Sequence, residues 1–162
     1  MDKRNKAVGI ILIVVTTLVF SVPFLIKVAI RQEYLEKGIY EVEKTFSHGG
    51  SFLETVFMIC EPPSDKDELE RVVINFIEEN DIVQTIKARK TSDFGSQIDP
   101  LEITLIKLYF VKPSKSYPIG WKSGDHAGFF SGFITDHTII IVRIPWDSTD
   151  TSDFEIIHRS EM

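Results

Sequence analysis

Residues 7–26 read AVGIILIVVTTLVFSVPFLI, twenty residues without a charge. A helix of that length spans roughly 30 Å at about 1.5 Å per residue, which is the thickness of the hydrocarbon core of a bilayer. Fourteen of the twenty are Ile, Leu, Val or Phe, and at roughly 0.3–0.6 kcal/mol each they favour insertion by about 4–8 kcal/mol. We therefore predict a transmembrane anchor over residues 7–30, preceded by a short basic tail over residues 1–6.

Basic residues lie on both sides of the anchor: Lys3, Arg4 and Lys6 before it, and Lys27, Arg31, Lys37 and Lys44 after it. The positive-inside counts are therefore nearly equal. A short basic tail before a first apolar helix usually stays in the cytoplasm, so we expect residues 31–162 outside it. Because the apolar run is longer than the 7–15 residues of a signal peptide, we predict an uncleaved, single-pass anchor in the cell membrane.

The chain after the anchor is acidic. The whole sequence has 18 Lys and Arg against 24 Asp and Glu, and residues 31–162 have 14 against 23, because the first thirty residues contain four basic residues and one acidic residue. Such a domain is a poor candidate for binding nucleic acid or an anionic lipid surface, so we predict no nucleic-acid partner. Cys60 is the only cysteine. No intramolecular disulfide can form, and its position in an apolar run favours packing as a small hydrophobe.

An amphipathic pattern follows the anchor over residues 31–48. Leu35, Ile39, Val42 and Phe46 recur at spacings of four, three and four residues, which is typical of one helix face. We predict a stalk helix that continues out of the membrane, although a glycine at position 38 costs about 1 kcal/mol in a helix interior. Two interpretations of the stripe are open: it packs on the chain's own sheet, or it binds a protein partner or a second copy in a homo-oligomer.

The rest of the sequence predicts an α+β domain over residues 51–146. Strand patterns cover residues 51–61, 82–90, 101–112, 126–134 and 138–144, and the best-patterned helix covers residues 64–80. The element order is then α-β-α-β-β-β-β. Consecutive late strands favour a mostly antiparallel sheet of four to six strands with one packed helix. Residues 147–162 read as an acidic C-terminal tail with a short final strand at Phe154, Ile156 and Ile157.

No motif specifies a catalytic or metal site. The sequence has no His-x-x-x-His, no cysteine pair and no Gly-x-Ser-x-Gly elbow, and its glycines match neither a dinucleotide nor a phosphate-loop pattern. Two Asp-His pairs end at His126 and His137. A hairpin between the last two predicted strands would hold these histidines roughly 25 Å apart at about 3.3 Å per residue, too far for a shared metal. We predict no catalytic residue, no metal and no cofactor.

Aromatic and glycine residues gather between positions 120 and 137, a composition common at recognition surfaces. The candidate binding surface consists of Trp121, Asp125, His126, Phe129, Asp136 and His137. The leading hypothesis is a membrane-anchored, non-catalytic protein-binding or scaffolding module of a bacterial envelope. The alternative is a membrane-anchored hydrolase that uses Asp125, His126 and His137.

The layout of residues 7–60 also resembles that of type IV pilins and pseudopilins. Members of that family have an N-terminal apolar helix with a proline near its middle, an amphipathic continuation and an antiparallel sheet. The resemblance implies a filament subunit. The family's motif is absent, because no basic leader ends in Gly before an aromatic-Thr-Leu-x-Glu start, and no Asp or Glu occurs within residues 7–26. A pilin-like subunit without the usual motif is therefore the third hypothesis.

Overall fold

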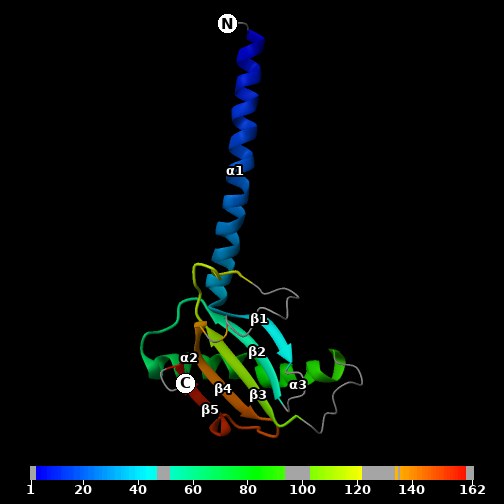
Figure 1. The fold of residues 1–162 in the computed structure, drawn as a ribbon, viewed down its shortest axis with the longest axis vertical. Coiled ribbons are helices and arrows are strands. Elements are labelled where there is room, and N and C mark those ends of the chain that lie inside the picture. Colours follow the sequence, from blue (N-terminus) through cyan, green and yellow to red (C-terminus); the bar gives the residue numbers. More distant parts are fainter. Residues whose placement is uncertain (1–2, 47–51, 94–102, 122–133, 135, 160–162) are drawn as a thin grey trace.

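A long helix, α1 (Lys3–Lys37), projects from a domain that contains a five-stranded sheet (Figure 1). The computed structural model describes residues 3–46, 52–93, 103–121, 134 and 136–159. In α1 the side chains are described at Val19 and from Ser21 onward, and Pro23 lies inside the helix. Within the described residues, no helix is long and apolar enough to cross a membrane.

α1 ends one residue before a glycine in the left-handed region. Gly38 has a φ of +66°, a conformation that caps many helices because glycine has no Cβ. Its N–H donates to the carbonyls of Tyr34 (3.2 Å) and Leu35 (3.1 Å), which closes the last turn. The chain then continues directly as a strand. The stalk helix predicted over residues 31–48 is therefore wrong beyond Lys37.

Ile39, Val42 and Phe46, predicted to share a helix face with Leu35, lie instead in β1 (Ile39–Phe46). Successive residues of a strand point to opposite faces of the sheet. Ile39 packs against the cluster on one face, whereas Val42 is buried on the other. The side chain of Phe46 lies outside the described residues. Once Gly38 ends the helix, the β-branched and aromatic residues of this segment favour a strand.

The sheet has the strand order β1-β2-β3-β4-β5 (Figure 1). Its other strands are β2 (Phe52–Ile59), β3 (Leu105–Val111), β4 (Thr138–Pro145) and β5 (Glu155–His158). Neighbouring strands are antiparallel except β2 and β3, which are parallel. The predicted α+β class is confirmed, with a mixed sheet. A short 3₁₀ helix, η3 (Thr151–Asp153), precedes β5. The final strand predicted at Ile156 and Ile157 is confirmed as β5, which is part of the sheet, whereas Phe154 lies just before it.

The parallel pair β2–β3 requires a crossover, and two helices lie within it. The first, α2 (Lys66–Glu79), confirms the predicted helix. Its N-terminus is capped by the Asp65 carboxylate, which accepts the N–H of Glu68 at 2.8 Å. The second is α3 (Ile82–Asp93).

α3 replaces the strand predicted over residues 82–90, so that prediction is wrong. Asp81 has a φ of +48°, which turns the chain between the two helices. Ile82 and Ile86 are both buried. Residues four positions apart share a face in a helix and also in a strand, so the apolar spacing could not separate the two structures.

The hairpin predicted between residues 126–134 and 138–144 is also wrong, because β4 pairs with β3 on one side and with β5 on the other. Ile134 and residues 136–137 are helical and lead directly into β4. Residues 126–133 lie outside the described part of the chain.

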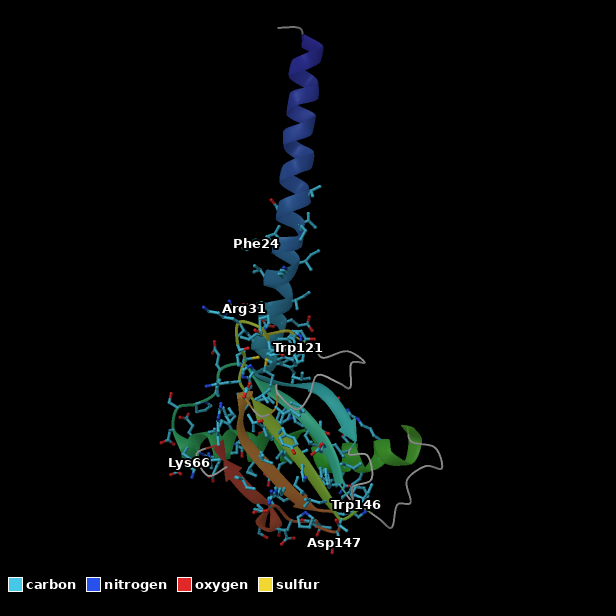
Figure 2. The ribbon with its side chains drawn as sticks, viewed as in Figure 1. Phe24, Arg31, Lys66, Trp121, Trp146 and Asp147 are labelled. Carbon is cyan, nitrogen blue, oxygen red and sulfur yellow. The ribbon has the colours of Figure 1, made fainter. Side chains whose placement is uncertain are left out.

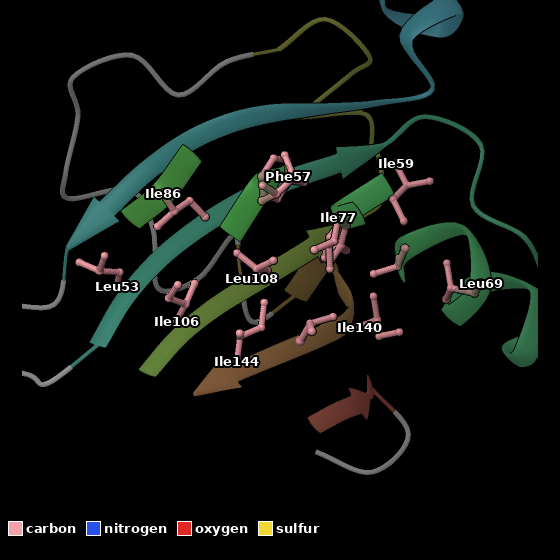
Figure 3. Packing of buried hydrophobic residues seen from close by; sticks show 14 of the residues in the cluster. Leu53, Phe57, Ile59, Leu69, Ile77, Ile86, Ile106, Leu108, Ile140 and Ile144 are labelled. Atoms are coloured by element: carbon pink, nitrogen blue, oxygen red, sulfur yellow. The ribbon is translucent and has the colours of Figure 1, made fainter. Parts of the chain in front are cut away.

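α2 and α3 pack on one face of the sheet, which we call the core face (Figure 3). Phe57 of β2 and Phe110 of β3 stack there with ring centroids 5.4 Å apart, and Phe76 of α2 meets both edge-on. Other fully buried side chains of the core face are Val73, Ile106, Leu108, Ile140, Val142 and Ile144. The opposite side, which we call the second face, carries a separate buried cluster.

Candidate functional site at the foot of the long helix

Side chains from four segments meet on the second face where α1 joins the domain. Tyr34 comes from α1, Tyr40 from β1 and Met58 from β2, while Tyr117 and Trp121 come from the segment after β3. We call these five residues the helix-foot cluster. Figure 2 shows Trp121 near the domain end of α1. The cluster therefore joins the long helix to the sheet.

Tyr40 is the centre of the helix-foot cluster. Its ring centroid lies 4.3 Å from that of Tyr34, and its hydroxyl accepts the N–H of Gly120 at 2.9 Å. The one hydroxyl proton can be donated to the Trp121 carbonyl at 3.3 Å or to the Met58 sulfur at 3.0 Å. The carbonyl is the stronger acceptor of the two. A single side chain thus connects α1, β2 and the segment after β3.

The segment after β3 lies directly against α1 at Gly120. This residue has a φ of +88°, which L-residues with a Cβ rarely adopt. A Cβ here would lie 3.0 Å from Cγ2 of Ile30 and 3.1 Å from Cδ2 of Tyr34. Both the backbone conformation and the close approach therefore require glycine. The contact fixes the segment to the side of α1 at the level of Ile30.

Cys60 lies beside the cluster, and its thiol donates to the carbonyl of Tyr34 at 3.2 Å. Burial raises the pKa of the Cys60 thiol, with a smaller contribution from the Glu61 carboxylate. Because the thiolate is the reactive form of cysteine, a raised pKa suppresses its nucleophilicity. The prediction that Cys60 packs as a small hydrophobe is confirmed by its buried position in the second-face cluster.

Replacement of Tyr40 by Phe is expected to change how stability depends on alkaline pH. Burial raises the pKa of Tyr40 from about 10 to about 12. The stabilisation linked to the protonated phenol is therefore complete below pH 10 and is lost as the pH rises to 12. Two pKa units correspond to about 3 kcal/mol. Urea unfolding of the full chain in detergent between pH 8 and 12 should show a smaller loss in Tyr40→Phe than in wild type, and parallel curves would contradict it.

The structure brings two of the predicted binding residues together around Tyr117. The ring centroid of Tyr117 lies 4.8 Å from that of Trp121 and 5.4 Å from that of His137. The N–H of Lys112 donates to the His137 carbonyl at 3.0 Å, which holds the start of β4 beside the end of β3. His137 therefore packs against the helix-foot cluster through its contact with Tyr117.

Among the described residues, no contact joins another predicted binding residue to the helix-foot cluster. Asp136 is exposed, and its carbonyl accepts from the Arg159 guanidinium at 2.6 Å. Asp125, His126 and Phe129 lie outside the described residues.

Sequence reasoning missed the three tyrosines of the cluster. Tyr34 follows the end of the apolar run by eight residues, and a tyrosine combines an apolar ring with a polar tip that suits a membrane–water interface. The position of a tyrosine shortly after the apolar run was the only sequence signal that could have indicated Tyr34 as a site residue. The contact of Tyr40 with Trp121 joins residues 81 positions apart, which no local pattern reveals.

A second group of polar side chains lies further along the second face. The Tyr109 hydroxyl donates to Oε1 of Glu54 at 2.8 Å. Burial raises the pKa of Tyr109, and the Glu54 carboxylate raises it further. The ammonium of Lys107 lies 3.8 Å from the same carboxylate oxygen and 3.4 Å from the centroid of the Phe52 ring. Three side chains from two neighbouring strands thus form one network.

The second face continues onto β4 and β5 with another ion pair. Arg143 lies 3.2 Å from Glu155, and its Nε is a buried donor for which no acceptor occurs among the described residues. We call Glu54, Lys107, Tyr109, Arg143 and Glu155 the charged ladder. Their side chains alternate with the apolar residues of the core face, as expected for a sheet with one wet side.

The described residues offer little for catalysis. They include no group of three or more His, Cys, Asp or Glu side chains that could hold a metal ion. A pocket of about 150 Å³ between the α2–α3 turn and the β4–β5 connection is lined in part by Glu78, Asp81, Ser148, Thr149 and Thr151. Its described lining contains no histidine that could activate a hydroxyl as a nucleophile. His158 is instead paired with Glu70 at 2.6 Å.

Comparisons with known proteins identify no relative: no family model, no curated protein and no solved structure matches this chain. The chemistry of the described sites is therefore the basis for assigning a function. These sites consist of a rigid aromatic junction at the foot of α1 and a charged surface on the adjoining sheet. Such an arrangement can position and bind, and the described part of it contains no assembled nucleophile and base.

Proposed function

We propose that this chain is a single-pass membrane protein whose α+β domain is a non-catalytic protein-binding or scaffolding module of a bacterial envelope. The observation that carries the membrane assignment is the surface of α1. Its large exposed apolar side chains are Val19, Val22, Phe24, Leu25, Ile26, Val28 and Ile30. A contiguous apolar surface of this kind requires a partner or a bilayer. The uncharged run over residues 7–26 has the length that a bilayer needs.

Lipid fits the α1 surface better than a single partner helix does. At 100° per residue, the exposed apolar positions between 19 and 30 spread over about two thirds of the helix circumference, and Lys27 is the one charge among them. A partner helix would cover one stripe and leave the others in water. A bilayer covers the whole circumference, and Lys27 can extend its ammonium to the headgroups.

The side of the membrane is tested by alkaline phosphatase, which needs disulfides and is active only in an oxidising compartment. The basic tail over residues 1–6 favours a cytoplasmic N-terminus. We therefore expect phosphatase fused after Met162 to be active in a bacterial host. The matched control is the same enzyme fused after Lys6, which should be inactive. An inactive C-terminal fusion at equal protein level would place the domain in the cytoplasm.

The charged ladder supports protein binding as the role of the domain. Its residues present both charge signs on the outer side of neighbouring strands: the side chains of Lys107 and Glu54 are about one fifth exposed, and those of Arg143 and Glu155 are 42% and 61% exposed. Complementary charges of this type give partner specificity more than raw affinity. The ladder lies on the sheet itself, so it is held rigidly by the core.

Photo-crosslinking in living cells tests the binding surface. A photoreactive residue at the exposed position of Glu155 should give a discrete protein adduct of defined mass. The matched control is the exposed position of Arg71 on α2, which should give none. Equal adducts at both positions, or no adduct at position 155 with the protein correctly folded in the membrane, would contradict binding through the charged ladder.

A further inference from the structure

We propose that the segment after β3, residues 112–121, is a second membrane contact that rests in the headgroup layer and binds anionic phospholipid headgroups. This contact rests on the anchoring proposed above, and it adds a site that an anchor alone does not require. It concerns the described part of the segment, which ends at Trp121.

The depth of the segment follows from its contact with α1. The apolar run ends at Ile26, and Ile30 lies four residues further along, about 6 Å at 1.5 Å per residue. The interfacial layer on each side of the hydrocarbon core is about 5–7 Å thick. Gly120 packs against the side chain of Ile30. The segment is therefore held at the level of the headgroups whenever the run over residues 7–26 fills the hydrocarbon core.

The residue types of the segment suit that level. Trp and Tyr are enriched at membrane–water interfaces because they combine apolar rings with polar tips. Trp121 and Tyr117 stack edge-on with centroids 4.8 Å apart, and both are only partly buried. Pro118 is exposed, and Ile119 beside it is half-buried. The end of the domain that faces the anchor is thus aromatic and apolar.

The net positive charge at the foot of α1 and in the segment after β3 favours contact with an anionic lipid surface. The foot of α1 and the segment after β3 carry five basic residues against two acidic ones: Lys27, Arg31, Lys37, Lys112 and Lys115 against Glu33 and Glu36. Each Lys or Arg close to an anionic leaflet contributes favourably. The acidic excess of the chain lies elsewhere. Asp147, beside Trp146, is at the end of the domain opposite α1 in Figure 2.

The helix-foot cluster makes the contact rigid. Tyr40 accepts the N–H of Gly120 and lies within hydrogen-bond distance of the Trp121 carbonyl, so the segment cannot move independently of β1. Two attachments to one membrane, a helix and a segment fixed beside it, restrict the tilt of the domain. The charged ladder would then be presented at a constant angle to the membrane.

The two tryptophans permit a direct test, because one lies at each end of the domain (Figure 2). Trp146→Phe leaves Trp121 as the sole reporter, and Trp121→Phe leaves Trp146. The full chain is reconstituted into vesicles of phosphatidylcholine and phosphatidylglycerol that carry a nitroxide quencher on the headgroup or deep in the acyl chain. We expect loss of Trp121 emission with the headgroup quencher, a smaller loss with the deep quencher, and no loss for Trp146.

Charge reversal separates the two parts of the contact. A nitroxide carried on the headgroup of phosphatidylglycerol should quench wild-type Trp121 more strongly than the same nitroxide carried on phosphatidylcholine. Lys112→Glu with Lys115→Glu should abolish this difference and leave the depth of Trp121 unchanged, and equal quenching by the two lipids in the wild-type chain would overturn binding of anionic headgroups. Unquenched Trp121 in a chain that floats with the vesicles would overturn the second contact and leave the anchor intact. A chain that does not float with vesicles would overturn the anchor and the second contact together.

Discussion

With α1 in the membrane as proposed, arginine at positions 15 and 19 together is expected to release about half of the chain from the membrane. Each arginine near the centre of a membrane helix costs about 2.5–3.5 kcal/mol, so the pair costs roughly 5–7 kcal/mol. The apolar residues of the run contribute about 4–8 kcal/mol in favour of insertion. The net free energy of insertion therefore falls close to zero. Alkaline carbonate extraction followed by flotation measures the fraction that remains in the membrane.

The matched control for this experiment is Val15→Leu with Val19→Leu, which changes the same positions without adding charge. It should remain fully in the membrane fraction. Val19 is 61% exposed on α1, so substitution at this position should not disturb the domain. Near-ultraviolet circular dichroism of the released protein checks that its tertiary structure is intact. A folded double-arginine variant that resists carbonate extraction would show that these residues do not lie in a bilayer.

The elements that could be predicted are those with one dominant local signal. α2 has five apolar residues at helical spacing, and the helix predicted there is confirmed. β4 reads TIIIVRIP, a run of β-branched residues too short for a long helix, and it is also confirmed. In both cases local propensity and tertiary packing favour the same structure.

The elements that were predicted wrongly have spacings that fit two structures. Residues 39, 42 and 46 match a helix stripe, but Gly38 adopts a left-handed conformation and ends α1 before them. Hydrogen bonding to β2 then holds the segment as a strand, with the Cys60 N–H donating to the Gly38 carbonyl at 2.8 Å. In α3, the spacing of Ile82 and Ile86 is the same in a helix and a strand. Tertiary context decides such cases.

The candidate site was less predictable than the fold because it is built from distant segments. Trp121 and His137 were predicted as binding residues from composition, and the structure places both against Tyr117. The centre of the helix-foot cluster is Tyr40, which lies in a segment that was predicted to be part of the stalk helix. A wrong element type thus concealed the one side chain that connects the helix to the sheet.

Phe110→Ala is expected to destabilise the domain by about 3–5 kcal/mol, the usual cost of truncating a fully buried phenylalanine. Phe110 has no exposed surface and stacks on Phe57 at 5.4 Å, with Phe76 edge-on at 6.3 Å. It lies on a central strand, so the surrounding backbone is hydrogen-bonded on both sides and can collapse little into the cavity. Urea unfolding of the full chain in detergent measures the change.

The matched control is Phe24→Ala, the same truncation at a side chain that is 66% exposed on α1. In detergent it should leave the unfolding free energy of the domain unchanged. Phe110→Leu, which refills most of the cavity, should recover part of the loss. A cost for Phe110→Ala no larger than that for Phe24→Ala would contradict the packing of the core face. Because neither substitution adds charge to residues 7–26, both variants should stay in the membrane fraction, which separates the stability of the domain from its anchoring.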